Sequence, residues 1–176
     1  MQSLVKTYLI SILACTTMGI GLQVASAADV IGKVPETTSA ETRPLTTNEL
    51  LKIYSNRSWM WKDGAGYFRV SGRQFTAWTK NGKDASYALG RWFLTDPGRV
   101  CFRATWHAAS GNAEALTCFE HRTDGATISQ RRLPDGEWYV FSHKPPQAGD
   151  EILKLKLGDR VAPRYEQNKR RLSKDG

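Results

Sequence analysis

The sequence lacks the residue patterns on which most enzymes and metal sites depend. Only three histidines and three cysteines occur among its 176 residues, and Gly-x-Ser-x-Gly, His-Glu-x-x-His and Cys-x-x-Cys patterns are all missing. His107, His121 and His143 form no His-x-His or His-x-x-x-His pair that would place two metal ligands on one face of an element. We therefore expect no catalytic residues, no metal and no cofactor.

A hydrophobic run long enough to cross a membrane is also missing. The apolar segment 8–22 is interrupted by Thr and Gly and falls short of the roughly 20 apolar residues that a spanning helix needs. It follows Lys6 and precedes Ala25-Ser26-Ala27, which is the pattern of a signal peptide cleaved before Ala28. An alternative is lipoprotein processing at Cys15. We expect a periplasmic or secreted protein with no transmembrane segment after processing.

Charge is not concentrated in one region. The chain has 25 Lys and Arg against 17 Asp and Glu, a net charge of +8, and this diffuse excess predicts no specific nucleic-acid site. One cluster stands out, formed by Lys169, Arg170, Arg171 and Lys174. It predicts a basic C-terminal tail over 161–176, which either is frayed or contacts an anionic surface.

The rest of the chain has the pattern of one small, mostly β domain. Residues 28–44 are rich in Thr, Ser, Glu and Pro, which predicts a flexible linker before a domain at 45–160. A capping box from Thr46 to Glu49 predicts one short N-terminal helix. Short aromatic and β-branched segments separated by turn formers then predict strands, near residues 58–62, 66–70, 74–79, 86–95, 99–107, 114–122, 127–132, 137–142 and 151–157. We expect an antiparallel up-and-down meander that closes to a small barrel or half-open sandwich.

The two cysteines beyond the leader predict one disulfide, because thiols in exported domains are oxidised. Cys101 and Cys118 lie in two predicted strands joined around Ser110-Gly111-Asn112. Pairing Cys101 with Cys118 also places Val100, Phe102, Ala104, Trp106, Ala115 and Phe119 on one apolar face. This register places the cysteines on the other face and His121 opposite Gly98.

The tryptophans allow two interpretations. We expect at least four of the six in the core, since small barrels are filled by side chains. Trp59 and Trp61, however, share one face of a strand, and such rings can line a cavity for a small ligand. The possible ligand-binding set is Trp59, Trp61 and Trp92, with Arg69, Arg91 and Arg103 at the mouth to hold an acidic group.

The ordered Trp and Cys markers resemble a known family. They are found in Gly64-Ala65-Gly66-Tyr67-Phe68, Phe75-Thr76-Ala77-Trp78, Tyr87-Ala88-Leu89-Gly90-Arg91-Trp92, Val100-Cys101-Phe102, Trp106, Cys118-Phe119-Glu120-His121 and Trp138-Tyr139-Val140-Phe141. Over about residues 45–145 the chain resembles the DUF995 family of exported proteobacterial proteins. The resemblance implies a small exported β domain with its two cysteines paired, and it implies no activity.

These observations favour a non-enzymatic binding or interaction module at the cell envelope, whose partner is an envelope component, a small ligand or a protein. One alternative is a lipocalin-like carrier of a small apolar or acidic ligand, with a void beside Trp59, Trp61 or Trp92. A second is a β-barrel enzyme inhibitor with a solid core. A hydrolase is the third, and it would require a histidine within about 3 Å of an Asp or Glu in a cleft.

Overall fold

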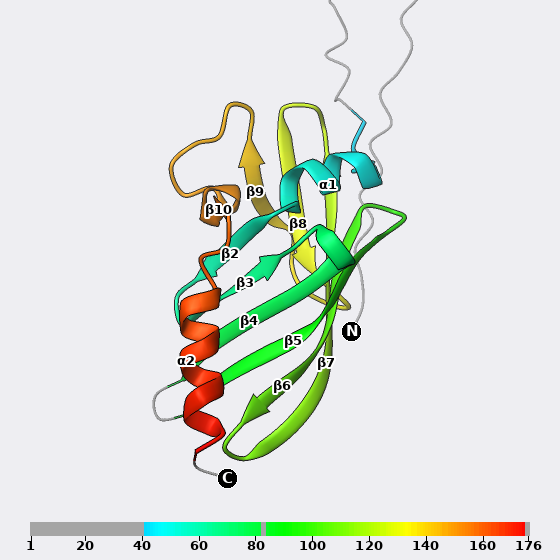
Figure 1. The fold of residues 1–176 in the computed structure, drawn as a ribbon. Coiled ribbons are helices and arrows are strands. Elements are labelled where there is room, and N and C mark those ends of the chain that lie inside the picture. Colours follow the sequence, from blue (N-terminus) through cyan, green and yellow to red (C-terminus); the bar gives the residue numbers. More distant parts are fainter. Residues whose placement is uncertain (1–40, 82–83, 175–176) are drawn as a thin grey trace, which may run out of the picture. The chain divides into compact units, whose positions relative to one another are not determined.

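The computed structural model describes residues 41–81 and 84–174 and has the topology of a meander (Figure 1). The elements in chain order are β1 (Arg43–Pro44), α1 (Thr47–Tyr54), β2 (Arg57–Trp61), β3 (Gly64–Phe68), the 3-10 helix η1 (Ser71–Arg73), β4 (Gln74–Asn81), β5 (Asp84–Thr95), β6 (Arg99–Ala108), β7 (Gly111–Thr123), β8 (Thr127–Arg132), β9 (Tyr139–His143), the 3-10 helix η2 (Glu151–Lys154), β10 (Leu155–Leu157) and α2 (Ala162–Leu172).

Neighbouring strands in the sequence are neighbours in the sheet. The order is β10-β2-β3-β4-β5-β6-β7-β8-β9, every pairing is antiparallel, and the sheet curls into a half-barrel. The predicted mostly β meander is therefore confirmed. The predicted register is confirmed as well, because Cys101 pairs with Cys118 and the two form a disulfide. The backbone N–H of His121 donates to the Gly98 carbonyl at 2.8 Å, as that register requires.

The concave face of the half-barrel carries the main core. The predicted capping box is present at the start of α1, with Thr46 and Glu49 each accepting from the other's backbone N–H. The apolar face of α1 places Leu50 and Tyr54, both fully buried, on the concave face. There they pack against Phe68, Trp92 and other sheet side chains. Helix α1 thus covers one end of the concave face.

The convex face is covered by α2, so the expected frayed tail over 161–176 is wrong for residues 162–172. In Figure 1 the orange-to-red helix α2 crosses the ends of β4 and β5, which it contacts. Val161 and Tyr165, four residues apart, are buried on the sheet, and the Asp159 carboxylate accepts from the backbone N–H of Val161 and Ala162. These apolar and capping signals occur within a segment whose composition is dominated by basic residues.

The expected strand over residues 151–157 and the expected linker end are also corrected. Residues Glu151–Lys154 form η2, and only Leu155–Leu157 pair with β2. The Asp150 carboxylate closes the turn that precedes η2 by accepting backbone N–H groups, and this favours a helical turn over an extended strand. At the other end of the domain, Arg43–Pro44 pairs with β7, so the sheet already includes residues assigned to the linker.

None of the helices in the described residues is long and apolar enough to cross a membrane. The predicted signal peptide, the alternative site at Cys15 and linker residues 28–40 lie outside the described residues.

Candidate functional site

Trp59 and Trp61 lie on the concave face, as strand alternation predicts. Across the strand pair they face Gly66 and Gly64, which have no side chains. A Cβ at Gly64 would lie 2.4 Å from Nε1 of Trp61, so the indole ring of Trp61 lies directly on the β3 backbone. Glycine at position 64 is thus required for this ring position, and Trp61 remains 37% exposed.

A groove of about 310 Å³ lies beside these rings, at the end of the concave face that α1 does not cover. We call it the aromatic groove. Its walls come from β2, β4, β6, β7, β8 and η2, and its lining residues are Trp59, Trp61, Thr79, Phe102, Trp106, Thr117, Phe119, Arg132 and Glu151. Trp59 contacts Phe119 edge to face at a centroid distance of 4.9 Å. The groove is therefore bounded mainly by aromatic rings held against one another.

Two charged residues line the aromatic groove, and they differ in their partners. The Glu151 carboxylate accepts from Nε1 of Trp59 at 2.8 Å and pairs with Nζ of Lys154 at 2.6 Å. Arg132 is exposed and forms no ion pair with any residue that the structure describes. Glu151 therefore fixes the Trp59 ring, whereas the Arg132 guanidinium is available to an acidic group in the groove.

The remaining predicted ligand residues do not join Trp59 and Trp61. Trp92 is fully buried, and its Nε1 donates to the Arg69 carbonyl at 2.7 Å. Arg69 itself pairs with Asp159 at 3.9 Å near α2. Arg91 and Arg103 lie on the convex face, where together with Trp92 they line a separate cavity of about 450 Å³. Arg91 and Arg103 are thus separated from Trp59 and Trp61 by the sheet.

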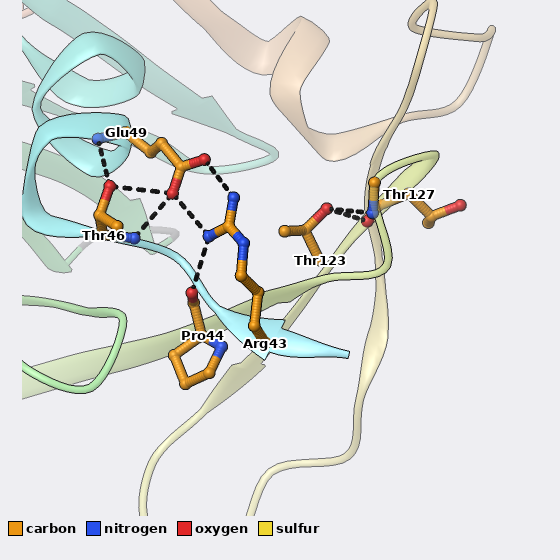
Figure 2. A network of polar contacts seen from close by, with 7 residues as sticks. Arg43, Pro44, Thr46, Glu49, Thr123 and Thr127 are labelled. Carbon is orange, nitrogen blue, oxygen red and sulfur yellow. Dashed lines mark hydrogen bonds and ion pairs between the residues drawn. The ribbon is translucent and has the colours of Figure 1, made fainter. Parts of the chain in front are cut away.

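Another cavity, of about 390 Å³, lies between α1 and the strands β7 to β9. Much of its polar lining is already satisfied within the protein, as Figure 2 shows for Arg43 and Glu49. Nη2 of Arg43 lies 2.7 Å from the Glu49 carboxylate, and this hydrogen bond is the main reason that the pKa of Glu49 falls to about 2. Such paired groups fasten α1 to the strands and leave little for a ligand to bind.

His143 lines the same cavity, with its Nδ1 2.8 Å from the Asp150 carboxylate. This separation is within the roughly 3 Å between a histidine and an acidic residue that a hydrolase would require. Burial raises the pKa of Asp150, but hydrogen bonds from the Gln147 and His143 backbones and from the His143 ring outweigh it and lower the pKa below its ordinary value. The nearby Ser142 hydroxyl donates to the His143 carbonyl, not to the ring. In the described part of the chain this pair therefore closes a loop and has no hydroxyl nucleophile bonded to it.

The other two histidines do not form such a pair. His107 is bonded to Asn112 and stacked on Tyr87, while His121 is fully buried in a network with Tyr54 and Gln130. No group of three His, Cys, Asp or Glu side chains arranged for a metal ion occurs within 41–81 and 84–174.

The basic residues of the predicted tail lie near the end of α2. Lys169, Arg170 and Arg171 are exposed and belong to the helix, and Lys174 follows it. Successive residues of a helix point about 100° apart, so these three do not form one cationic face. Contact of this segment with an anionic surface stays a prediction.

Sequence reasoning assigned Phe102, Trp106 and Phe119 to the apolar face of the hairpin but not to a ligand site. These residues share a face with Trp61 through strand alternation. Recognising this from the sequence requires the register of the three intervening strands β3, β4 and β5. Trp59 and Trp92 are buried and Trp78 and Trp106 pack half-buried against the two cores, which accounts for four of the six tryptophans.

Comparison with known proteins agrees with the family resemblance. A family model described as a protein of unknown function (DUF995) matches residues 19–161, which is most of the chain. No curated protein and no solved structure matches it. The chain therefore belongs to the DUF995 family.

Proposed function

We propose that this domain is a non-enzymatic binding module that holds a small apolar molecule with an acidic group in the aromatic groove. The observation that carries the proposal is a groove of about 310 Å³ walled by five aromatic rings, one of which, Trp61, is more than a third exposed. Its volume lies at the lower end of the range of small-molecule sites, which are mostly apolar with a few polar groups.

Ligand binding would remove this aromatic surface from water. At about 25 cal/mol per Å², covering about 100 Å² of ring surface contributes about 2.5 kcal/mol. Arg132 at the rim has no acidic partner among the described residues, and a guanidinium binds a carboxylate or sulfonate through paired hydrogen bonds. The aromatic walls and the free arginine together favour an amphipathic, acidic ligand over a purely polar one.

The proposed location is the periplasm or the outside of the cell. Support comes from the signal-peptide pattern and from the disulfide between Cys101 and Cys118, since such bonds persist in oxidising compartments. A carrier fits the groove better than an enzyme inhibitor does, because an inhibitor needs no hollow on its concave face.

The groove can be tested with the fluorescent probe 1-anilinonaphthalene-8-sulfonate, which combines apolar rings with an anionic group. We expect saturable binding to the folded protein and about tenfold weaker binding after Trp61→Ala or Trp106→Ala, equivalent to about 1.4 kcal/mol. Arg132→Gln should weaken binding by a smaller factor, because the exposed charge pair is screened by water.

Trp138→Ala is the matched control, because Trp138 is 36% exposed but lies outside the groove. Circular dichroism should confirm that each variant is folded, since the probe also binds partly folded chains. Equal affinities of the Trp61, Trp106 and Trp138 variants, or no saturable binding by the parent protein, would refute the proposed site.

A further inference from the structure

Two arginines on the convex face lie directly opposite each other. Arg91 on β5 pairs with Arg103 on β6 in the antiparallel register, and both are exposed. Like charges in directly opposed positions destabilise a sheet. Neither side chain forms an ion pair or hydrogen bond with a residue that the structure describes. The sheet therefore holds two positive charges together without a counter-charge from any described residue.

A third arginine lies at the same place. Arg73 ends η1 with a φ of +51°, an unusual backbone conformation for a residue with a side chain. Its guanidinium carbon lies 4.5 Å from the centroid of the Trp92 ring. Nη1 of Arg73 is buried and has no hydrogen-bond partner within residues 41–81 and 84–174. Stacking on Trp92 thus fixes this side chain, while one of its donors is unpaired among the described residues.

Arg73, Arg91 and Arg103 line one cavity of about 450 Å³ with Trp92 and Phe93, and its lining contains no acidic residue. The nearest acid in the register is Glu114, which pairs with Thr105 and forms no ion pair with Arg103 within 4 Å. Glu120 on β7 is already engaged by Arg131 at 2.7 Å. The carboxylates in the part of the chain that the structure describes thus leave these three cations uncompensated.

We propose that this cavity binds the phosphate group of a phosphate ester. Three guanidinium groups offer forked donors that match the several oxygens and the double charge of a phosphate monoester, whereas a carboxylate has only two oxygens. Leu89 and Phe93 are exposed on β5, each next in alternation to Arg91, and Leu116 is exposed on β7 opposite Arg103. The organic part of the ester is therefore apolar. This site is separate from the aromatic groove and does not depend on its function.

The experiment uses the folded chain with two probes, inorganic phosphate and vesicles of phosphatidylcholine with or without phosphatidic acid. We expect inorganic phosphate to raise the melting temperature of the parent protein, and Arg91→Gln/Arg103→Gln to abolish that rise. The same double variant should melt at a higher temperature than the parent in phosphate-free, low-salt buffer, because the repulsion between the arginines is removed. That increase also demonstrates that the variant folds.

Lys62→Gln/Lys156→Gln is the charge-matched control, because both lysines are exposed and lie outside the cavity. Vesicle binding that depends on phosphatidic acid and falls at least tenfold in the arginine variant identifies a lipid phosphate. A phosphate response without vesicle binding identifies a soluble phosphate ester. The proposal is overturned if the two double variants behave alike, or if the parent protein responds to neither probe. The affinity of the arginine variant for the anilinonaphthalene probe in the aromatic groove should stay within about twofold of the parent affinity. The two proposed sites can therefore fail independently, and each failure can be recognised.

Discussion

His121 is the most deeply buried titratable base of the domain, and it lies in a network that joins α1 to three strands. Its Nε2 is 2.8 Å from the Tyr54 hydroxyl, and Nδ1 faces the Gly98 carbonyl at 3.3 Å. Gln130 donates to the Tyr54 hydroxyl, and Tyr139 donates to Gln130. A neutral ring with its proton on Nδ1 satisfies these contacts, since Nε2 then accepts from Tyr54. Burial lowers the pKa of His121 from 6.5 to about 4.

This shift predicts how stability depends on pH. The unfolded chain binds a proton at His121 near pH 6.5 and the folded chain only near pH 4, so between these values the unfolded state holds more protons. The free energy of unfolding therefore falls as the pH falls through this window. The expected loss is about 3 kcal/mol in all, of which about 1.5 kcal/mol is lost between pH 6.5 and about pH 5. Urea unfolding at several pH values measures it.

His107→Asn is the control variant, because His107 is only partly buried and lies outside the His121 network. The paired carboxylates Glu120 and Asp150 have lowered pKa values and lose their contribution at lower pH, so the upper half of the window isolates the histidine. A His121 ring signal that titrates near pH 6.5 by NMR in the folded protein would contradict the buried, neutral state.

Residues that act within one strand or hairpin were predictable from the sequence. Strand alternation placed Trp59 and Trp61 on one face, and the Cys101–Cys118 register followed from the two strands and their turn. Contacts that depend on distant segments were not predictable. Glu151 reaches Trp59 across 92 positions, and Arg73 reaches Trp92 only because η1 turns back over the sheet. No local pattern encodes either contact.

At the scale of elements, α2 is the main correction, and its role in stability can be tested. Tyr165 is buried against Tyr87, with ring centroids 5.3 Å apart, and Asn168 donates to the carbonyls of Thr79 and Ser86 at 3.3 and 2.8 Å. Tyr165→Ala should lower the free energy of unfolding by about 2–4 kcal/mol, because it leaves a cavity between helix and sheet. Denaturant unfolding is the measurement.

Arg170→Ala on the exposed side of the same helix should change stability by less than about 0.5 kcal/mol. If both variants are equally stable, α2 does not contribute to the folded domain. The helical spacing of its buried face, with Val161, Tyr165 and Asn168 separated by four and three residues, was present in the sequence. The basic composition of the segment concealed this short stripe, because two buried positions in the eleven residues of α2, with Val161 just before them, give a weak periodic signal.

At the scale of the whole molecule, the two faces of the half-barrel carry different features. The concave face contains α1 at one end and the aromatic groove at the other, whereas the convex face carries α2, the arginine cavity and the disulfide. Up-and-down order was predictable from the regular turns. How far the sheet closes was not predictable from the sequence. The two edges of the sheet meet through η2, which contacts β9 and β2. In the described part of the chain, no pair of hydrogen-bonded strands, which alternating residues would indicate, joins these edges.

The disulfide is expected to stabilise the fold, and one double variant tests both that role and its independence from the aromatic groove. Cys101 and Cys118 are 17 residues apart and join neighbouring strands β6 and β7. Replacing both with Ala should lower the free energy of unfolding by about 3 kcal/mol, because the unfolded chain loses its loop constraint. Binding in the aromatic groove should persist wherever the variant is folded, since the bridge lies on the opposite face. Loss of binding by a folded double variant would mean that the bridge shapes the groove.

Native mass spectrometry on the protein isolated from its own cells, without refolding, tests the remaining proposals together. Export predicts a chain that begins at Ala28 and is two hydrogens lighter than the reduced form, because the oxidised pair carries no thiol protons. A mass that begins at an acylated Cys15 would instead indicate lipoprotein processing, and an intact leader with free thiols would contradict export. A small co-purifying mass that is lost in Trp61→Ala would assign a natural ligand to the aromatic groove, whereas one lost in Arg91→Gln/Arg103→Gln would assign it to the convex cavity.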